Sequence, residues 1–216
     1  MALNVETLER IKSRIQDKNV TLVAVTKTRT SDEINPLLDH GIADIGENRV
    51  QHWLEKRDQI NPGFRLHIIG HLQRNKVKYV VPGAYMIQSV DNELLLAEIN
   101  KYALRYSAPV NILLQVNTAR EPQKSGVLEE DFPKLFDAAQ NCGGVRLRGL
   151  MCMAPLEGGL DAAREAFDRA YALYTGYKPR AGADFDTLSM GMSGDYETAI
   201  GCGATMIRLG RILFEP

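Results

Sequence analysis

The stretch Thr21-Leu22-Val23-Ala24-Val25-Thr26-Lys27 decides the fold of this chain. It is a short apolar run rich in β-branched residues, and it predicts a buried strand over 21–27. The following Thr30-Ser31-Asp32-Glu33 is a capping-box pattern that predicts a helix through Leu38. Upstream, residues 5–16 have apolar side chains at helical spacing. The chain is therefore expected to begin with a helix, which a strand–helix unit follows.

The strand–helix unit repeats along the rest of the chain. Further strands are predicted over 43–47, 64–70, 84–90, 110–117, 145–153, 185–190 and 205–209. Helices are predicted over 49–60, 74–80, 92–106, 132–139, 163–174 and 195–201. Eight strands share 216 residues, about 27 each, which is close to the minimum length of a βα repeat. Because the strands are continuous apolar runs, they suit a parallel sheet covered on both faces.

The predicted fold class is α/β, as a single (β/α)8 TIM barrel that forms one domain over residues 1–216. No linker rich in proline, glycine or serine divides the sequence. The last strand has no helix after it, and the extra N-terminal helix is expected to fill that place in the outer ring. The rival is an open doubly wound sheet, but no GxGxxG motif follows the first strand to support it.

The composition excludes several classes of protein. Lysine and arginine number 26 against 27 acidic residues, so no general nucleic-acid binding is expected. No apolar run approaches the roughly 18 residues of a membrane span, and no secretory signal is visible at the start. The three cysteines, Cys142, Cys152 and Cys202, form no CxxC pair, which favours a cytoplasmic protein without disulfides.

In this fold the chemistry is expected at the loops that follow the strands. Val23, Val25 and Lys27 share one face of the first predicted strand, so Lys27 points into the barrel if the valines do. A lysine there suits imine formation, with an ordinary surface lysine as the alternative. Cationic neighbours in a desolvated site favour the neutral amine that an imine requires. Arg208 is the candidate neighbour, because the last strand adjoins the first in a closed barrel.

Two segments near the end of the chain predict a phosphate site. The segment 189–196, Ser-Met-Gly-Met-Ser-Gly-Asp-Tyr, joins the seventh strand to a helix, and its small residues leave backbone N–H groups open to an anion. The segment 208–211, Arg-Leu-Gly-Arg, follows the eighth strand. Barrels of this kind often hold phosphate at these two loops. Together with Lys27, they point to a phosphorylated carbonyl compound held as an imine.

Five motifs then occur in a fixed order between residues 24 and 214. They are Ala-Val-Thr-Lys at 24–27, Gly-Glu-Asn-Arg-Val-Gln at 46–51, Ile-Gly-His-Leu-Gln-Arg-Asn-Lys at 69–76, Leu-Ser-Met-Gly-Met-Ser at 188–193 and Arg-Leu-Gly at 208–210. In these motifs the chain resembles the pyridoxal phosphate homeostasis protein family. The resemblance implies one barrel like the N-terminal domain of alanine racemases, of the fold-type III class of enzymes that use pyridoxal 5′-phosphate (PLP).

The resemblance also implies a function and a set of residues. The chain would hold PLP as a lysine imine and act in intracellular PLP (vitamin B6) and amino-acid homeostasis without established catalytic turnover. It implies no catalytic residue. In the PLP site it implies, Lys27 forms the imine and Arg208 faces the pyridine nitrogen. The phosphate is held mainly by backbone N–H groups of Ser193, Gly194, Gly210 and Arg211, and the pocket is lined by Asn48, His71 and Ser189. PLP-dependent apoenzymes are the implied partners of a monomer or weak dimer.

One segment departs from the family pattern. The family often ends in Gly-Thr-x-Ile-Phe-Gly, whereas this chain has Gly-Arg-Ile-Leu-Phe at 210–214. The threonine hydroxyl contact to phosphate is therefore in question. Arg211 either replaces it with charge or points to solvent and offers its backbone N–H alone.

Other functions stay open at this point. A PLP-dependent racemase or lyase on the same barrel would need a tyrosine across the cofactor, and Tyr196 is expected to pack on its short helix instead. A Schiff-base aldolase would have no need of Arg208. The basic stretch 73–78 could contact RNA, but it lacks interleaved aromatic residues. His67 and His71 have metal-like spacing, but on a strand they would not align, so no metal is expected.

Overall fold

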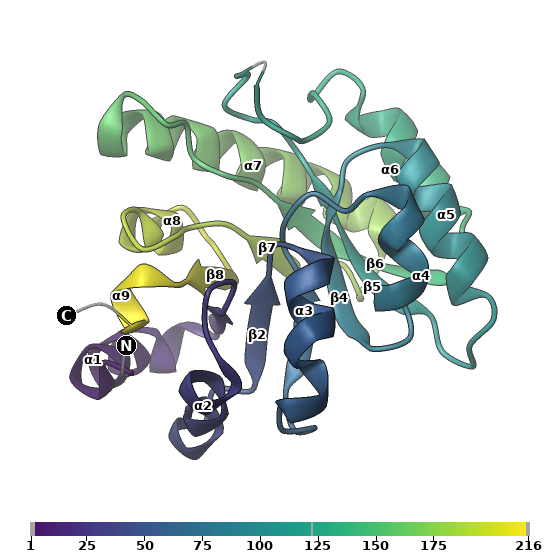
Figure 1. Cartoon of the computed structure of the whole chain (residues 1–216). Coiled ribbons are helices and arrows are strands. Elements are labelled where there is room, and N and C mark those ends of the chain that lie inside the picture. Colours follow the sequence, from purple (N-terminus) through teal and green to yellow (C-terminus); the bar gives the residue numbers. More distant parts are fainter. Residues whose placement is uncertain (1–2, 122, 215–216) are drawn as a thin grey trace.

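The chain forms a closed barrel of eight parallel strands in the order β1 to β8 (Figure 1). This computed structural model describes residues 3–121 and 123–214. The strands are β1 (Thr21–Val25), β2 (Asp44–Glu47), β3 (Arg65–Ile68), β4 (Ala84–Val90), β5 (Val110–Gln115), β6 (Val145–Met151), β7 (Thr187–Ser189) and β8 (Met206–Leu209). The predicted barrel is confirmed and the open sheet is wrong, because β1 pairs with β8 and places Val23 opposite Arg208.

Helices separate the strands and cover the barrel. They are α1 (Val5–Ile15), α2 (Ser31–Ile34), α3 (Val50–Lys56), α4 (Val77–Val80), α5 (Glu93–Ala103), α6 (Phe132–Gln140), α7 (Gly159–Ala181), α8 (Tyr196–Gly201) and α9 (Arg211–Phe214). Short 3₁₀ turns η1 (Gln16–Lys18), η2 (Asn35–His40), η3 (Arg57–Gln59) and η4 (Arg74–Lys76) extend or precede four of them. The capping box predicted at Thr30 and Glu33 is present.

Two predicted boundaries are wrong in ways that affect the site. The first strand ends at Val25 rather than Lys27, because the Arg29 N–H bonds back to the Thr26 carbonyl and turns the chain. The last strand is not bare: α9 follows it, and the N–H of Asn4, just before α1, bonds to the Leu213 carbonyl of α9. The N-terminal helix therefore lies beside a short final helix instead of replacing it (Figure 1).

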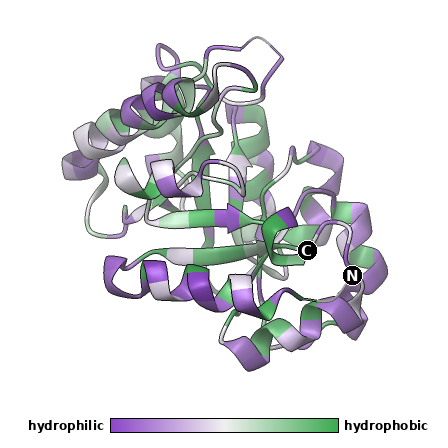
Figure 2. Cartoon of the chain, turned by 90° about the vertical axis from the view of Figure 1, so that its left-hand side faces the viewer, coloured by the Kyte–Doolittle hydropathy of each residue, from purple (hydrophilic) through white to green (hydrophobic). Residues whose placement is uncertain are grey.

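Two apolar clusters stabilise the barrel. The larger lies between the strands and the outer helices, which have one apolar face each (Figure 2). The smaller lies inside the barrel and consists of Val23, Met86, Leu113, Met151 and Met206, with Met153 packed against it. The interior also contains buried polar side chains, which bear on the site described below.

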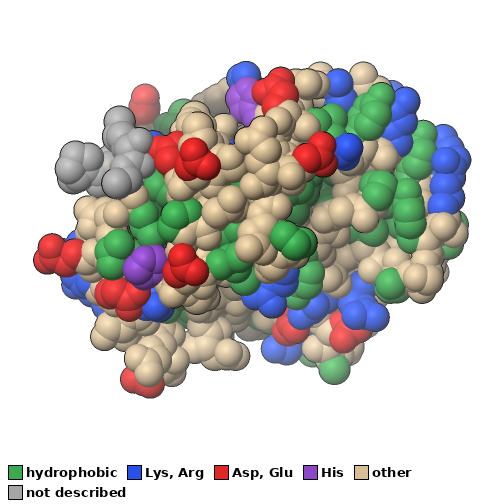
Figure 3. Space-filling model, turned by 60° about the horizontal axis from the view of Figure 1, so that its bottom comes forward, with side chains coloured by type: hydrophobic (Ala, Val, Ile, Leu, Met, Phe, Trp, Pro, Cys, Tyr) green, Lys and Arg blue, Asp and Glu red, His purple; other side chains and the backbone are tan. Residues whose placement is uncertain are grey.

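One face of the surface has no single dominant charge. On the face shown in Figure 3, acidic and basic side chains form several separate groups among apolar ones. Within residues 3–121 and 123–214, no helix is long and apolar enough to cross a membrane.

Candidate functional site

Lys27 lies in the turn after β1, at the carboxyl end of the barrel. Its side chain is exposed, so it is not buried beneath the valines of its strand as the alternation of a longer strand predicted. Val23 does point into the barrel, in the interior apolar cluster. The amine of Lys27 is thus accessible at the mouth while the chain before it is anchored in the core.

Side chains of β2 and α3 hold the turn that carries Lys27. The ammonium group of Lys56 donates to the Thr26 carbonyl at 2.8 Å and to the Arg29 carbonyl at 3.1 Å, and it lies 2.7 Å from a carboxylate oxygen of Glu47. The Thr26 hydroxyl donates to the same oxygen of Glu47 at 2.5 Å. Nδ1 of His52 lies 3.2 Å from the Lys27 carbonyl.

This clamp fixes the backbone on both sides of Lys27 and leaves its side chain free to reach a ligand. Sequence reasoning missed it. The available signal was Glu47 at the end of the predicted strand 43–47. A carboxylate at such a position, which the structure shows to be buried, needs a cationic partner.

Arg208 lies on β8, the strand that pairs with β1, and is 4% exposed. Its guanidinium donates to the Ser189 hydroxyl at 2.6 Å and to the Cys152 carbonyl at 2.8 Å. Desolvation in this site lowers the pKa of Arg208, but an arginine stays charged at neutral pH. Two of its five N–H donors are engaged by these bonds, so the group can still donate to a further acceptor.

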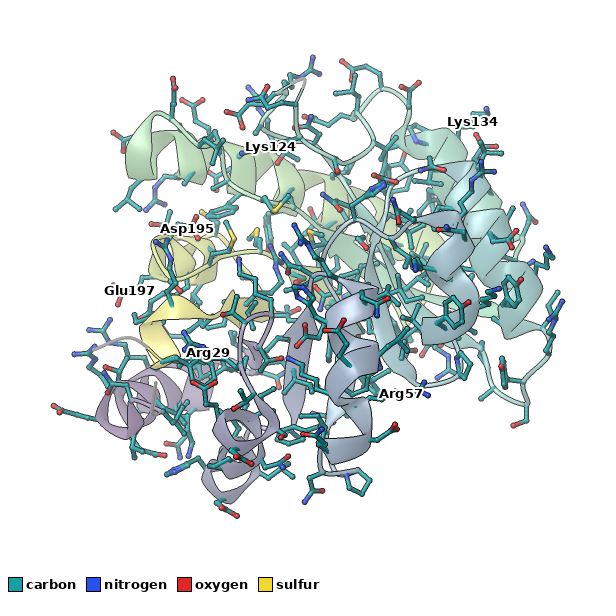
Figure 4. The ribbon with its side chains drawn as sticks, viewed as in Figure 1. Arg29, Arg57, Lys124, Lys134, Asp195 and Glu197 are labelled. Carbon is teal, nitrogen blue, oxygen red and sulfur yellow. The ribbon has the colours of Figure 1, made fainter. Side chains whose placement is uncertain are left out.

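The conformation of the loop between β7 and α8 depends on Gly191 and Asp195. Gly191 has φ +94°, and a Cβ there would lie 2.6 Å from the Cβ of Ala199. The carboxylate of Asp195 accepts from the Met192 N–H at 2.5 Å (Figure 4). The Ser193 hydroxyl accepts from the Ile212 N–H at 3.5 Å, which joins this loop to α9. The two segments predicted to hold phosphate are therefore neighbours.

Backbone N–H groups at this junction fit an anion. Outside helices and strands, no described backbone bond uses the N–H of Ser193, Gly194 or Gly210. Arg211 is the first residue of α9, where a helix has no internal acceptor for its N–H. A Cβ on Gly194 would meet nothing within 4 Å, so the chain is open there. These donors suit a phosphate dianion.

Asn48 and His71 lie beside each other in the loops after β2 and β3. Both line a pocket of about 300 Å³ together with Arg49, Gln73 and Lys76. A Cβ on Gly70 would lie 2.3 Å from the Asn48 carbonyl oxygen, so these loops touch backbone to backbone. Ser193 and Gly194 line a different pocket, of about 360 Å³. Asn48 and His71 thus line one pocket, and Ser193 and Gly194 line another.

Ser189 is the one predicted pocket residue that is completely buried. It lies inside the barrel, where its hydroxyl bonds to both Arg208 and Gln88, so its link to the proposed site is the bond with Arg208. Tyr196 packs as expected: it is buried, and its hydroxyl donates to Glu197 at 3.0 Å. Within the described ranges, no three His, Cys, Asp or Glu side chains are grouped to hold a metal, and His67 bonds to Asp44.

Comparisons with known proteins agree with this geometry. Residues 5–215 match the family described as the alanine racemase N-terminal domain. A pyridoxal phosphate homeostasis protein of Deinococcus radiodurans is 40% identical over 200 residues, covering 90% of this chain and 88% of that protein. One from Aquifex aeolicus is 33% identical over 219 residues, covering 97% and 96%.

A solved structure gives the same result in three dimensions. PipY of Synechococcus elongatus, with PLP bound, is 30% identical and has a TM-score of 0.89, covering 97% of this chain and 98% of that one. The barrel described above and that protein therefore share one architecture over nearly their whole lengths.

Proposed function

The chain belongs to the alanine racemase N-terminal domain family and, within it, to the pyridoxal phosphate homeostasis proteins, and on that premise we propose that it binds PLP at the barrel mouth through Lys27. Its role is to hold and release PLP in the cell's PLP (vitamin B6) and amino-acid homeostasis. Lys27, Arg208, Ser189 and the N–H groups of the loops after β7 and β8 form the core of the site.

The observation that carries this proposal is the packing of Gly210 against β1. A Cβ on Gly210 would lie 3.2 Å from the Cβ of Val25 and 3.4 Å from the Val25 carbonyl oxygen. Val25 is two residues before Lys27, and Gly210 is two residues after Arg208. The strand ends that carry Lys27, Arg208 and Gly210 are therefore neighbours, which supports one site that uses the amine, the guanidinium and the backbone N–H groups.

PLP supplies an aldehyde that reacts with a primary amine and a pyridine ring that draws electrons from the bound carbon. Arg208 offers donors alone, so it favours an unprotonated ring nitrogen and weakens that electron withdrawal. Tyr196, the tyrosine weighed as an acid/base group, is bonded to Glu197. These residues favour binding over turnover, so the protein is proposed to be a PLP carrier or regulator, not an enzyme.

Asn48 and His71 are proposed to border the PLP site from the side of β2 and β3, and Arg211 to offer its backbone N–H. The exposed Arg211 side chain is proposed not to replace the missing threonine hydroxyl. The proposed setting is the cytoplasm, the proposed recipients are PLP-dependent apoenzymes, and the proposed state is one domain as a monomer or weak dimer.

The test is covalent trapping. The protein is incubated with PLP, reduced with borohydride and digested, and the adduct is mapped by mass spectrometry beside an absorbance spectrum. We expect the pyridoxyl adduct on Lys27, its loss in Lys27→Ala, and its retention in Lys18→Ala, which removes another exposed lysine. An adduct spread over surface lysines would contradict the site, and racemisation or cleavage of amino acids by the pure protein would favour the racemase or lyase alternative.

A further inference from the structure

A chain of buried hydrogen bonds crosses the inside of the barrel and ends at Arg208. We call it the interior chain, and its members are Asp44 on β2, His67 on β3, Gln88 on β4, Ser189 on β7 and Arg208 on β8. Each is at most 4% exposed. β4 and β7 are not neighbours in the barrel, so the bond between Gln88 and Ser189 passes through the interior.

Every link of the interior chain has good geometry. Nε2 of His67 lies 2.9 Å from Oδ1 of Asp44, and Nε2 of Gln88 lies 2.9 Å from Nδ1 of His67. The Ser189 hydroxyl donates to Oε1 of Gln88 at 2.7 Å and accepts from Arg208 at 2.6 Å. At the other end, the Arg65 guanidinium donates two hydrogen bonds to the Asp44 carboxylate, 2.8 Å to Oδ1 and 2.5 Å to Oδ2.

The proton positions along the interior chain follow from its ends. Arg208 can only donate, so the Ser189 oxygen accepts and its single hydrogen goes to Oε1 of Gln88. The amide nitrogen of Gln88 then donates to Nδ1 of His67, which must be unprotonated. The remaining hydrogen of the imidazole, on Nε2, is directed to the carboxylate of Asp44. One arrangement therefore satisfies all five groups.

Burying the polar groups of the interior chain costs desolvation free energy, which suggests that the chain serves a purpose beyond stability. It lies in the same barrel interior as the apolar cluster of Val23, Met86, Leu113, Met151 and Met206, where apolar side chains of similar volume would need no partners. Sequence reasoning gave roles in the PLP site to Ser189 and Arg208 but did not connect them to Gln88, His67 or Asp44, which stand within mainly apolar strands. The Arg208 end of the interior chain belongs to the residues proposed to bind PLP, whereas the Asp44 end is held by Arg65.

We propose that Gln88, His67 and Asp44 are positioning residues for PLP: they fix the Ser189 hydroxyl and, through it, the orientation of the Arg208 guanidinium toward the pyridine ring. The proposal rests on the function proposed above. It extends the PLP site from the barrel mouth to the Arg65–Asp44 pair, at the amino ends of β3 and β2. None of the three side chains is expected to touch PLP.

The decisive variant is Gln88→Met, with Met86→Ala as its matched control. Both residues lie on β4 and are buried, and Met86 belongs to the interior apolar cluster rather than to the interior chain. Gln88→Met leaves the Ser189 hydroxyl without its acceptor and His67 without its donor. We expect PLP to be released about tenfold faster, equivalent to about 1.4 kcal/mol, with a shifted absorbance maximum of bound PLP. For Met86→Ala we expect release within about twofold and an unshifted maximum, as for a change in packing alone.

The conservative variant Gln88→Glu separates positioning from a merely structural role. A carboxylate can still accept from Ser189, and it can pair with a proton on Nδ1 of His67, so the interior chain can form again with a protonated imidazole. We expect Gln88→Glu to keep PLP release within about threefold of the original and to move the ring ¹⁵N signals of His67.

Nitrogen NMR of the PLP-free protein tests the interior chain independently of PLP. With His67 assigned by comparison with His67→Phe, its ring should show a bare Nδ1 and a protonated Nε2. A protonated Nδ1 in the unchanged protein would overturn the proton arrangement. Gln88→Met and Met86→Ala with equal release rates and spectra would overturn the positioning role. Failure to bind PLP with the His67 pattern intact would instead contradict the proposed function.

Discussion

The ammonium group of Lys56 donates a 2.8 Å hydrogen bond to the carbonyl oxygen of Thr26, the residue that precedes Lys27. Lys56 is 12% exposed and also pairs with Glu47, whose side chain is completely buried. The turn of the lysine that is proposed to bind PLP is thus held by a second lysine, whose own charge is paired with the Glu47 carboxylate.

Replacing Lys56 by methionine should destabilise the protein by about 3 kcal/mol, because it leaves the Glu47 charge buried without its partner. It should also loosen the turn that carries Lys27 and lower the yield of borohydride-trapped adduct. Urea denaturation measures the first effect and mass spectrometry the second. Lys134→Met is the control, since Lys134 pairs with Glu93 on the exposed surface (Figure 4). A loss below about 1 kcal/mol, the range of exposed pairs, would contradict the clamp.

The two glycines of the β7–α8 loop should respond differently to alanine. Gly191→Ala should cost about 2 kcal/mol, because φ is +94° and the new Cβ would overlap Ala199. Gly194→Ala should leave the free energy of unfolding within about 0.5 kcal/mol, since nothing lies within 4 Å of its Cβ position. Thermal and urea unfolding of both variants checks this. Equal losses would mean that the loop conformation does not depend on Gly191.

The carboxylate of Asp44 should make stability depend on acid. Burial alone would raise its pKa, but hydrogen bonds from His67 and Arg65 more than offset that effect and hold the pKa below the ordinary value of 3.8. Because the unfolded chain protonates first, the stabilisation is complete above about pH 4 and is lost as the pH falls through the lowered pKa of the folded protein.

Asp44→Asn should therefore lose about 2 kcal/mol at pH 7, where hydrogen bonds to a charged group are replaced by weaker ones. The difference from the unchanged protein should shrink below pH 4. Urea denaturation at several pH values measures it, and Asp39→Asn, on the exposed end of η2, should show no such trend. A difference that is constant down to pH 2.5 would contradict the assigned role of the charge.

The cysteines should react with alkylating agents in a fixed order. Burial raises the pKa of the Cys152 thiol to about 12 and that of Cys202 to about 11, so both hold their protons at pH 8. Cys142 is half-buried, and its pKa is raised as well, again by burial. Iodoacetamide at pH 8, followed by peptide mapping, should label Cys142 first. Early labelling of Cys152 would mean that the barrel beneath Arg208 opens readily.

The order of the elements could be predicted from the sequence because it depends on local patterns. Apolar runs such as 84–90 predict buried strands, and the strand β4 has those bounds. Element boundaries could not be predicted where a hydrogen bond ends an element early. The turn at Thr26 removed Lys27 from its strand, and α9 formed because the N–H of Leu213 finds the Gly210 carbonyl.

By itself, the sequence determined the barrel and the pairing of its ends, since the order of apolar runs and helical patterns expresses short-range chemistry. The site residues it proposed came largely from the resemblance to the pyridoxal phosphate homeostasis proteins. Only the tertiary structure decided that Lys56 and Glu47 hold the turn of Lys27, and that Asp44, His67 and Gln88 connect through Ser189 to Arg208. The hydrogen bonds of these two groups join residues 19 to 101 positions apart. Burial favours a partner for each polar side chain, but which partner it contacts depends on closure of the barrel, and no local pattern records that.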